Sequence, residues 1–94
     1  PMVTIKTIYP GAEAGTIESQ VTEKIEEAIS RIGGVDNIIS TSSEGASVVM
    51  VKFFLERDIN EATNDVRDKV AAVLLPKDAK TPLVSKLDIG GASI

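Results

Sequence analysis

Hydrophobic and polar residues follow two different spacings along this 94-residue chain. The stretch MVTIKTIY (residues 2–9) alternates in the manner of a β-strand, and its many β-branched residues favour that structure. From about Ala14 onward the apolar residues recur every three or four positions, with glutamates on the opposite side, which predicts an amphipathic helix. The dipeptide Pro10-Gly11 ends the predicted strand, and a pair of glycines at 33–34 ends the helix.

The centre of the chain predicts a β-hairpin. VDNIISTSS (35–43) has the pattern of a strand whose latter half is polar, and SVVMVKFFLE (47–56) is the strongest strand pattern of the sequence. Glu44 and Gly45 lie between the two strands and predict the turn that joins them.

A second amphipathic helix is predicted over residues 59–74. Asp58 followed three residues later by Glu61 is an aspartate version of the capping box, which marks a helix start. Pro76 ends the helix because the residue before a proline disfavours helical backbone angles. The apolar residues expected to face the core are Ile59, Ala62, Val66, Val70, Val73 and Leu74.

A fourth strand, LVSKLDI (83–89), completes the order β-α-β-β-α-β. Right-handed crossovers place both helices on one face of a four-stranded antiparallel sheet, which is the ferredoxin-like arrangement of the α+β class. We expect one domain over residues 1–94, with 1–89 as the ordered unit and 90–94 as a linker leading out of it.

Since both helices cover one side of the sheet, the other side is expected to be open. If Val49, Val51 and Phe53 meet the helices, the intervening residues of that strand look outward. The expected open-face residues of the two central strands are Val48, Met50, Lys52 and Phe54, with Thr4, Lys6 and Ile8. Two interpretations remain: an ordinary solvated face with lysine stems over apolar neighbours, or a contact surface.

Composition excludes several classes of function. The net charge is −4, the sequence pI is about 4.7, and the aromatic residues are Tyr9, Phe53 and Phe54 alone, so neither a basic stripe nor a base-stacking platform for nucleic acid is present. The chain has no Cys and no His, which removes thiolate chemistry and the usual zinc ligands. No apolar run approaches the ~20 residues that span a bilayer, and no signal peptide is recognisable.

Catalytic groups are not apparent either. Glu26-Glu27 and the pair Asp65 and Asp68 lie on helix faces, where neighbouring side chains diverge and no calcium-binding loop spacing exists. The run Ser40 to Ser43 has no histidine and no nucleophile-elbow motif beside it. We therefore expect no enzyme, no catalytic residue, no metal site and no cofactor.

Several stretches together resemble the first porter subdomain of resistance-nodulation-division (RND) efflux pumps. These are YPGAEAGTIESQVTEKIEEAI (9–29) with its Tyr-Pro-Gly-Ala corner, GVDNIISTSSEG (34–45), and NDVRDKVAAVLLPKDAKTPLVSKLD (64–88). The resemblance extends from Val3 to Asp88 in matching order and spacing. It implies a piece of the hydrophobe and amphiphile exporter branch, which also accounts for a chain that begins at Pro1.

The resemblance further implies location and partners. RND pumps are proton-driven homotrimers of the bacterial inner membrane, and their porter subdomains lie in the periplasm. The expected partners are the remainder of the transporter chain, a periplasmic adaptor and an outer-membrane channel, with no direct membrane contact by this segment. The proton-relay residues belong to the membrane part of such pumps.

Two groups of residues match functional positions of the family. The second helix resembles the one that lines a central pore, which implies pore-facing positions at Asn60, Asn64, Arg67 and Ala71. The open sheet face resembles a wall of the substrate pocket, which implies pocket positions at Lys6, Val48, Met50 and Lys52. Arg67 and the two lysines depart from the uncharged residues of well-known multidrug pumps, and the lysines favour anionic or amphiphilic acids, or pairing with acids on a neighbouring subdomain.

A different class of function stays open. A ferredoxin-like fold also suits a stand-alone regulatory or small-molecule-binding domain that dimerises through its open sheet face. The flanking sequence discriminates the two, because a transporter requires membrane helices beside this segment.

Overall fold

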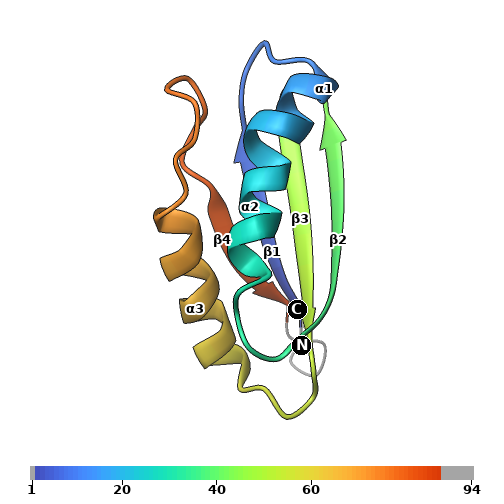
Figure 1. Cartoon of the computed structure of the whole chain (residues 1–94), viewed down its shortest axis with the longest axis vertical. Helices are drawn as coiled ribbons and strands as arrows, with labels where there is room; N and C mark the ends of the chain where they lie inside the picture. The colour runs from blue at the N-terminus through green and yellow to red at the C-terminus, as the bar shows by residue number, and fades with distance from the viewer. Residues whose placement is uncertain (1, 88–94) are drawn as a thin grey trace.

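The computed structural model describes residues 2–87 of the chain and confirms the α+β fold (Figure 1). Four strands form one antiparallel sheet in the order β2-β3-β1-β4, so β1 and β3 are the central pair. The predicted linker 90–94 and the end of the predicted last strand, 88–89, lie outside the described residues. The elements are β1 (Met2–Ile8), α1 (Ala14–Ile17), a π-helical turn η1 (Glu18–Thr22), α2 (Glu23–Ile29), β2 (Val35–Ser43), β3 (Ala46–Phe53), α3 (Ile59–Ala71) and β4 (Leu83–Leu87).

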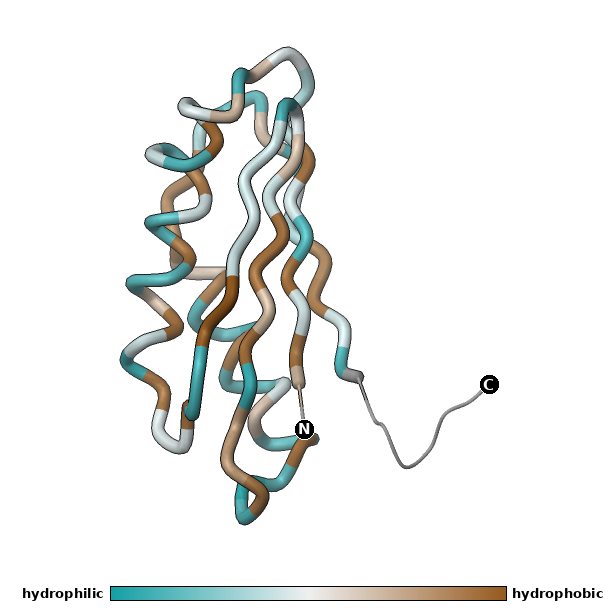
Figure 2. The backbone as a smooth tube through the Cα atoms, turned by 90° about the vertical axis from the view of Figure 1, so that its right-hand side faces the viewer, coloured by the Kyte–Doolittle hydropathy of each residue, from teal (hydrophilic) through white to brown (hydrophobic). Residues whose placement is uncertain are grey.

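The molecule has two layers, with all helices on one face of the sheet. In Figure 1 the α1–η1–α2 helix lies in front of the strands and α3 lies beside it, next to β4; in Figure 2 the helices lie to one side of the strands. The core between the layers is aliphatic apart from Phe53. Its fully buried members from the strands are Val3, Ile5, Val49 and Val51, and those from the helices are Ile17, Val21, Ile25, Ile29, Ala62 and Val66. The strand parity predicted from the sequence is therefore confirmed.

The first helix contains a wide π-helical turn at Glu18–Thr22. Its buried residues recur every four positions, from Ile17 through Val21 and Ile25 to Ile29. A strict four-residue repeat drifts around an α-helix of 3.6 residues per turn, and one wide turn compensates for that drift. The turn thus keeps the apolar stripe on the sheet over the whole length of the helix.

The same turn places Thr22 in a buried cluster of hydroxyl groups. Thr22 Oγ1 lies 2.7 Å from Ser47 Oγ and 2.9 Å from Ser42 Oγ. Ser42 also donates to Glu18 Oε1, at 2.5 Å, and Ser40 donates to Glu26 Oε2 at the same distance. These bonds tie β2 to the first helix, and they account for the polar latter half of that strand.

The Pro10-Gly11 corner directs the chain from β1 onto the helical layer. Gly11 has φ +82°, a left-handed backbone conformation that residues other than glycine rarely adopt. Tyr9 N donates to Gly45 O at 2.8 Å, and Gly45 N donates to Ala12 O at 2.9 Å. The corner is thereby fastened to the β2–β3 turn, a contact that the sequence did not predict.

Two element ends differ from the prediction. β3 ends at Phe53 and not at residue 56: one more bond in the same register follows, from Phe54 N to Gly34 O at 2.9 Å, and the chain then turns, with Arg57 N donating to Phe54 O at 3.0 Å. The helix predicted to residue 74 ends at Ala71, and tighter i–3 bonds follow it. Leu74 was expected to face the core and is 86% exposed, so that expectation is wrong.

Candidate functional site: the open sheet face and the exposed flank of α3

The four predicted pocket residues lie together on the open face of the two central strands. Lys6 of β1 stands opposite Val48 of β3, and Lys52 stands opposite Met2 at the other end of the pair. Met50 lies between them, opposite Thr4. The hydrogen-bond register of the sheet thus brings all four side chains onto one continuous surface, on the side away from the helices.

The apolar members of this surface are only partly covered, and its lysines are exposed. Val48 and Met50 are half-buried between their neighbours, whereas Lys6 and Lys52 project into solvent. Lys52 Nζ lies 3.8 Å from Asp36 Oδ2, with side chains 57% and 39% exposed, so this ion pair is weak. Asp36 is brought to Lys52 by an irregularity in the β2–β3 register between Val35 and Asn37. Among residues 2–87, no carboxylate pairs with Lys6.

The outer strands widen the open face with residues that the sequence prediction did not include. In register, Ile39 of β2 stands beside Met50, and Leu83 of β4 stands beside Lys6. Both are large and exposed, at 48% for Ile39 and 67% for Leu83. The alternation of β2 and β4 was the signal that could have found them, because it assigns every second residue to this side. The open face is therefore a mixed surface of four strands, in which apolar side chains lie among two lysines and hydroxyl residues such as Thr4, Thr41 and Ser85.

The four predicted pore residues are exposed on α3, on the far side of the sheet from the pocket residues. Asn60, Asn64, Arg67 and Ala71 lie at one flank of the helix, toward the edge strand β4. There Asn60, Asn64 and Arg67 line a notch together with Thr63 and with Lys86 of β4. Sequence reasoning missed Lys86, which reaches α3 only because β4 is the strand beneath it. The two predicted groups are thus separate surfaces and not one site.

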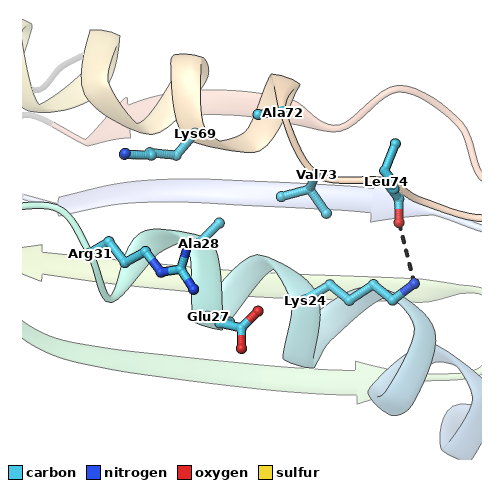
Figure 3. A pocket seen from close by; sticks show the side chains of 8 residues that line it. All are labelled: Lys24, Glu27, Ala28, Arg31, Lys69, Ala72, Val73 and Leu74. Carbon is cyan, nitrogen blue, oxygen red and sulfur yellow. Dashed lines mark hydrogen bonds between the residues drawn. The ribbon is translucent and has the colours of Figure 1, made fainter.

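A third feature, not predicted, is a groove of about 460 Å³ between α2 and the C-terminal end of α3 (Figure 3). Ala28 and Val73 supply apolar lining, and Arg31 and Lys69 lie at one end. At the other end Lys24 Nζ donates to the Leu74 carbonyl at 3.3 Å. The three cations lie where helix C-termini present free carbonyls, and cations are favourable there. The helix ends therefore explain why cations line the groove, and no ligand is needed to account for them.

The arrangement of these surfaces favours contact with a ligand or with a neighbouring surface. Within residues 2–87, no three acidic side chains gather where a metal ion could be held. Nor does any helix of that range combine the length and apolarity that a membrane crossing requires. The exposed lysines, amides and aliphatic side chains offer hydrogen bonds, charge and apolar area to a ligand or a neighbouring surface.

Comparison with known proteins identifies the family. The sequence profile described as the AcrB/AcrD/AcrF family matches residues 1–94. The chain belongs to the AcrB/AcrD/AcrF family. It is accordingly a porter subdomain of an RND transporter, as the sequence resemblance predicted.

Curated relatives agree with this assignment. The swarming motility protein SwrC of Bacillus subtilis (strain 168) is 36% identical over 94 residues, which is all of this chain and 9% of SwrC. The multidrug resistance protein MdtC of Serratia proteamaculans (strain 568) is 41% identical over 78 residues, 81% of this chain and 8% of that protein. The chain thus spans about a tenth of the length of the relatives it matches.

Solved structures confirm the fold. A crystal structure of a heavy metal efflux pump matches with a TM-score of 0.84 over 92% of this chain and 9% of the pump, at 24% sequence identity. A second crystal form of a heavy metal efflux pump gives a TM-score of 0.82 at the same identity. At this identity the match establishes the ferredoxin-like arrangement and not the transported substrate.

Proposed function

We propose that this chain forms part of the substrate pocket and of the central pore of a proton-driven RND exporter in the bacterial inner membrane. The open sheet face is the pocket wall, with Lys6, Val48, Met50 and Lys52 in contact with substrate. The flank of α3 with Asn60, Asn64, Arg67 and Ala71 is the pore wall in a homotrimer. The segment lies in the periplasm, and an adaptor and an outer-membrane channel continue the export path.

The observation that carries this proposal is the composition of the open face. Half-buried Val48 and Met50 lie between two exposed lysines, and Ile39 and Leu83 extend the apolar area on both sides. An apolar surface with a cation suits a molecule that has an apolar body and an anionic group. Since Lys6 has no carboxylate partner within residues 2–87, it is the better candidate for the anionic group. The substrates are therefore anionic amphiphiles.

Lysine replacement in the complete transporter tests the pocket. Lys6→Thr and Lys52→Gln, singly and together, are expected to lower export of anionic amphiphiles several-fold and to leave cationic substrates unchanged or better exported. Lys77→Gln, in the exposed segment after α3, is the matched control because it removes the same charge from a residue outside the strands of the sheet. Unchanged selectivity in the double variant would exclude the pocket role.

The alternative is a stand-alone domain that dimerises through the open face. An antibody against this chain, applied to soluble and membrane fractions of the source cell, distinguishes the two. The transporter requires a membrane-bound band many times larger than the 9.9 kDa of this segment. A small soluble band would contradict it.

A further inference from the structure

One arginine joins the start of α3 to other parts of the fold. Arg57 lies in the turn between β3 and α3, and its side chain is 19% exposed. Its Nε donates to Gly33 O, in the connection from α2 to β2, at 3.0 Å. Its Nη1 donates to Glu61 Oε1 at 3.3 Å, and its Nη2 donates to Asp65 Oδ2. A single guanidinium therefore links the first turns of α3 to the end of the first helix.

The side chain of Arg57 is also confined by its surroundings. Its guanidinium lies over the ring of Phe53, with Cζ 5.8 Å from the ring centroid, so it contacts the covered face of the sheet. A Cβ added at Gly34 would come within 2.9 Å of Arg57 Cδ, so the stem fills the space beside that glycine. The guanidinium is planar, and its donors keep a fixed geometry. These contacts hold Arg57 in one place between the sheet and both helices.

The ion pairs of Arg57 determine the position of α3 more than they determine its stability. Glu61 and Asp65 have side chains that are 74% and 48% exposed, and such exposed pairs contribute little to the free energy of unfolding. A rigid guanidinium that holds two acids one helical turn apart nevertheless limits rotation of the helix about its axis. The flank of Asp65 is held toward the end of α2, which leaves Asn60 and Asn64 toward β4.

The C-terminal half of α3 lacks a comparable tie. Beyond Asp65, no side chain of this helix bonds to another element among residues 2–87. Hollows of about 460 Å³ toward α2 and about 370 Å³ toward the start of β4 flank this half (Figure 3). On the β4 side the helix is held at its start, where Lys86 Nζ donates to Asn60 Oδ1 at 2.6 Å. The orientation of the whole helix thus depends on polar bonds in its first two turns.

We propose that Arg57 is a positioning residue, which fixes the rotation of α3 and thereby the direction in which Asn60, Asn64 and Arg67 face. This inference rests on the proposed function, in which those three side chains line the pore. Arg57 contacts no substrate in this role, because its donors bond to its own chain on the covered side of the sheet. Its replacement changes the passage of substrate and leaves binding at the open face intact.

Cross-linking in the complete transporter measures the position of α3 directly. Asn60→Cys and Lys86→Cys place one thiol on α3 and one on β4, at side chains that meet through the 2.6 Å bond, in a segment with no cysteine of its own. A short bis-maleimide is expected to join them in products that keep the mass of one chain, and mass spectrometry of the linked peptides gives the yield. Addition of Arg57→Met, which keeps an apolar stem over Phe53 and removes the guanidinium donors, is expected to lower this yield several-fold.

Arg31→Met is the matched control, because Arg31 is an exposed arginine just after α2 that forms no ion pair within residues 2–87. It is expected to leave the yield unchanged, and Arg57→Lys is expected to restore part of the loss. Asp65→Asn removes one ion pair alone, and the smaller loss expected from it keeps the test valid if Arg57→Met does not fold. Yields equal to the parent's for Arg57→Met and Asp65→Asn, or an equal loss in Arg31→Met, would overturn the inference.

Export kinetics test the consequence for the pore. With fluorescent anilinonaphthalene sulfonate as the anionic amphiphilic probe, Arg57→Met is expected to lower the maximal export rate several-fold and to leave the half-saturating concentration unchanged. A variant that is merely less stable lowers the amount of folded transporter, so rates are compared per folded trimer. An unchanged maximal rate, or a changed half-saturating concentration, would overturn the role of Arg57 at the pore. A parent transporter that exports no anionic amphiphile would overturn the proposed function, and the cross-linking yields would still decide whether Arg57 positions α3.

Discussion

The two faces of the sheet are built from the same strands and are fixed by different requirements. On β3, Val49, Val51 and Phe53 point to the helices and are at most 1% exposed. The alternate residues Val48 and Met50 are only half-buried on the open face. One face is thus determined by packing within this chain, and the other is not.

This difference shows at which positions of the sheet the side chains can change without loss of the fold. A covered position tolerates only side chains that fill its space, because a protein interior is close-packed. Open-face positions carry no such constraint, so lysines such as Lys6 and Lys52 cost the fold little. In the proposed function, these lysines are explained by contact with substrate and not by the stability of the sheet.

The sharpest test of the comparison uses two adjacent phenylalanines. Phe53→Ala is expected to lower the free energy of unfolding by about 3–5 kcal/mol, since it removes a fully buried ring and leaves a cavity. Phe54→Ala is expected to change it by roughly 0.5 kcal/mol, because Phe54 is 49% exposed beyond the end of β3. Urea unfolding of the 94-residue chain measures both. Similar losses for the two variants would mean that the end of β3 does not separate covered from open positions.

Much of the fold was predictable because local pattern and global packing agree. Alternation in β1 and β3 assigned each residue to its face, and the Asp58 cap was confirmed, with Asp58 Oδ1 accepting from Asn60 N at 2.8 Å. The ends of β3 and α3 were predicted too far along the chain. The chain turns after Phe54, where Arg57 N donates to Phe54 O, and tighter i–3 bonds replace the α-helical ones after Ala71. The apolar patterns continue past both points, so they do not reveal these ends.

The corner at Gly11 directs the chain to the covered face, and its replacement should have the next largest effect. Gly11→Val is expected to destabilise by about 1–3 kcal/mol, because φ +82° is strained for a β-branched residue. A Cβ at this position meets no atom within 4 Å, so the loss comes from backbone strain and not from a clash. Thermal unfolding of the chain measures the change.

Gly15→Ala is the matched control for Gly11. This glycine lies in α1, also with no atom within 4 Å of an added Cβ, and it is not among the glycines with positive φ. Alanine is the better helix former, so this variant is expected to gain up to about 1 kcal/mol. Opposite signs for the two variants support the corner argument, and a neutral Gly11→Val would contradict it.

The candidate sites were predictable only in part. The parity of β1 and β3 found Lys6, Val48, Met50 and Lys52 as one surface, and the register confirms that they adjoin. Lys86 could not be placed, because its approach to Asn60 depends on which strand lies beneath α3. Similarly, Asp36 reaches Lys52 through a register irregularity that the alternation of β2 does not reveal.

The smallest expected effect concerns this pair on the open face. Lys52→Gln is expected to lower the free energy of unfolding by less than about 1 kcal/mol, since both side chains are largely solvated and the charged atoms are 3.8 Å apart. A double-mutant cycle with Asp36→Asn isolates the interaction, and added salt should reduce it further. Lys6→Gln is the control, because within residues 2–87 it has no carboxylate partner to lose. A coupling well above 1 kcal/mol would mean that the lysines stabilise the sheet itself, and the open face would then need no outside ligand to explain its charge.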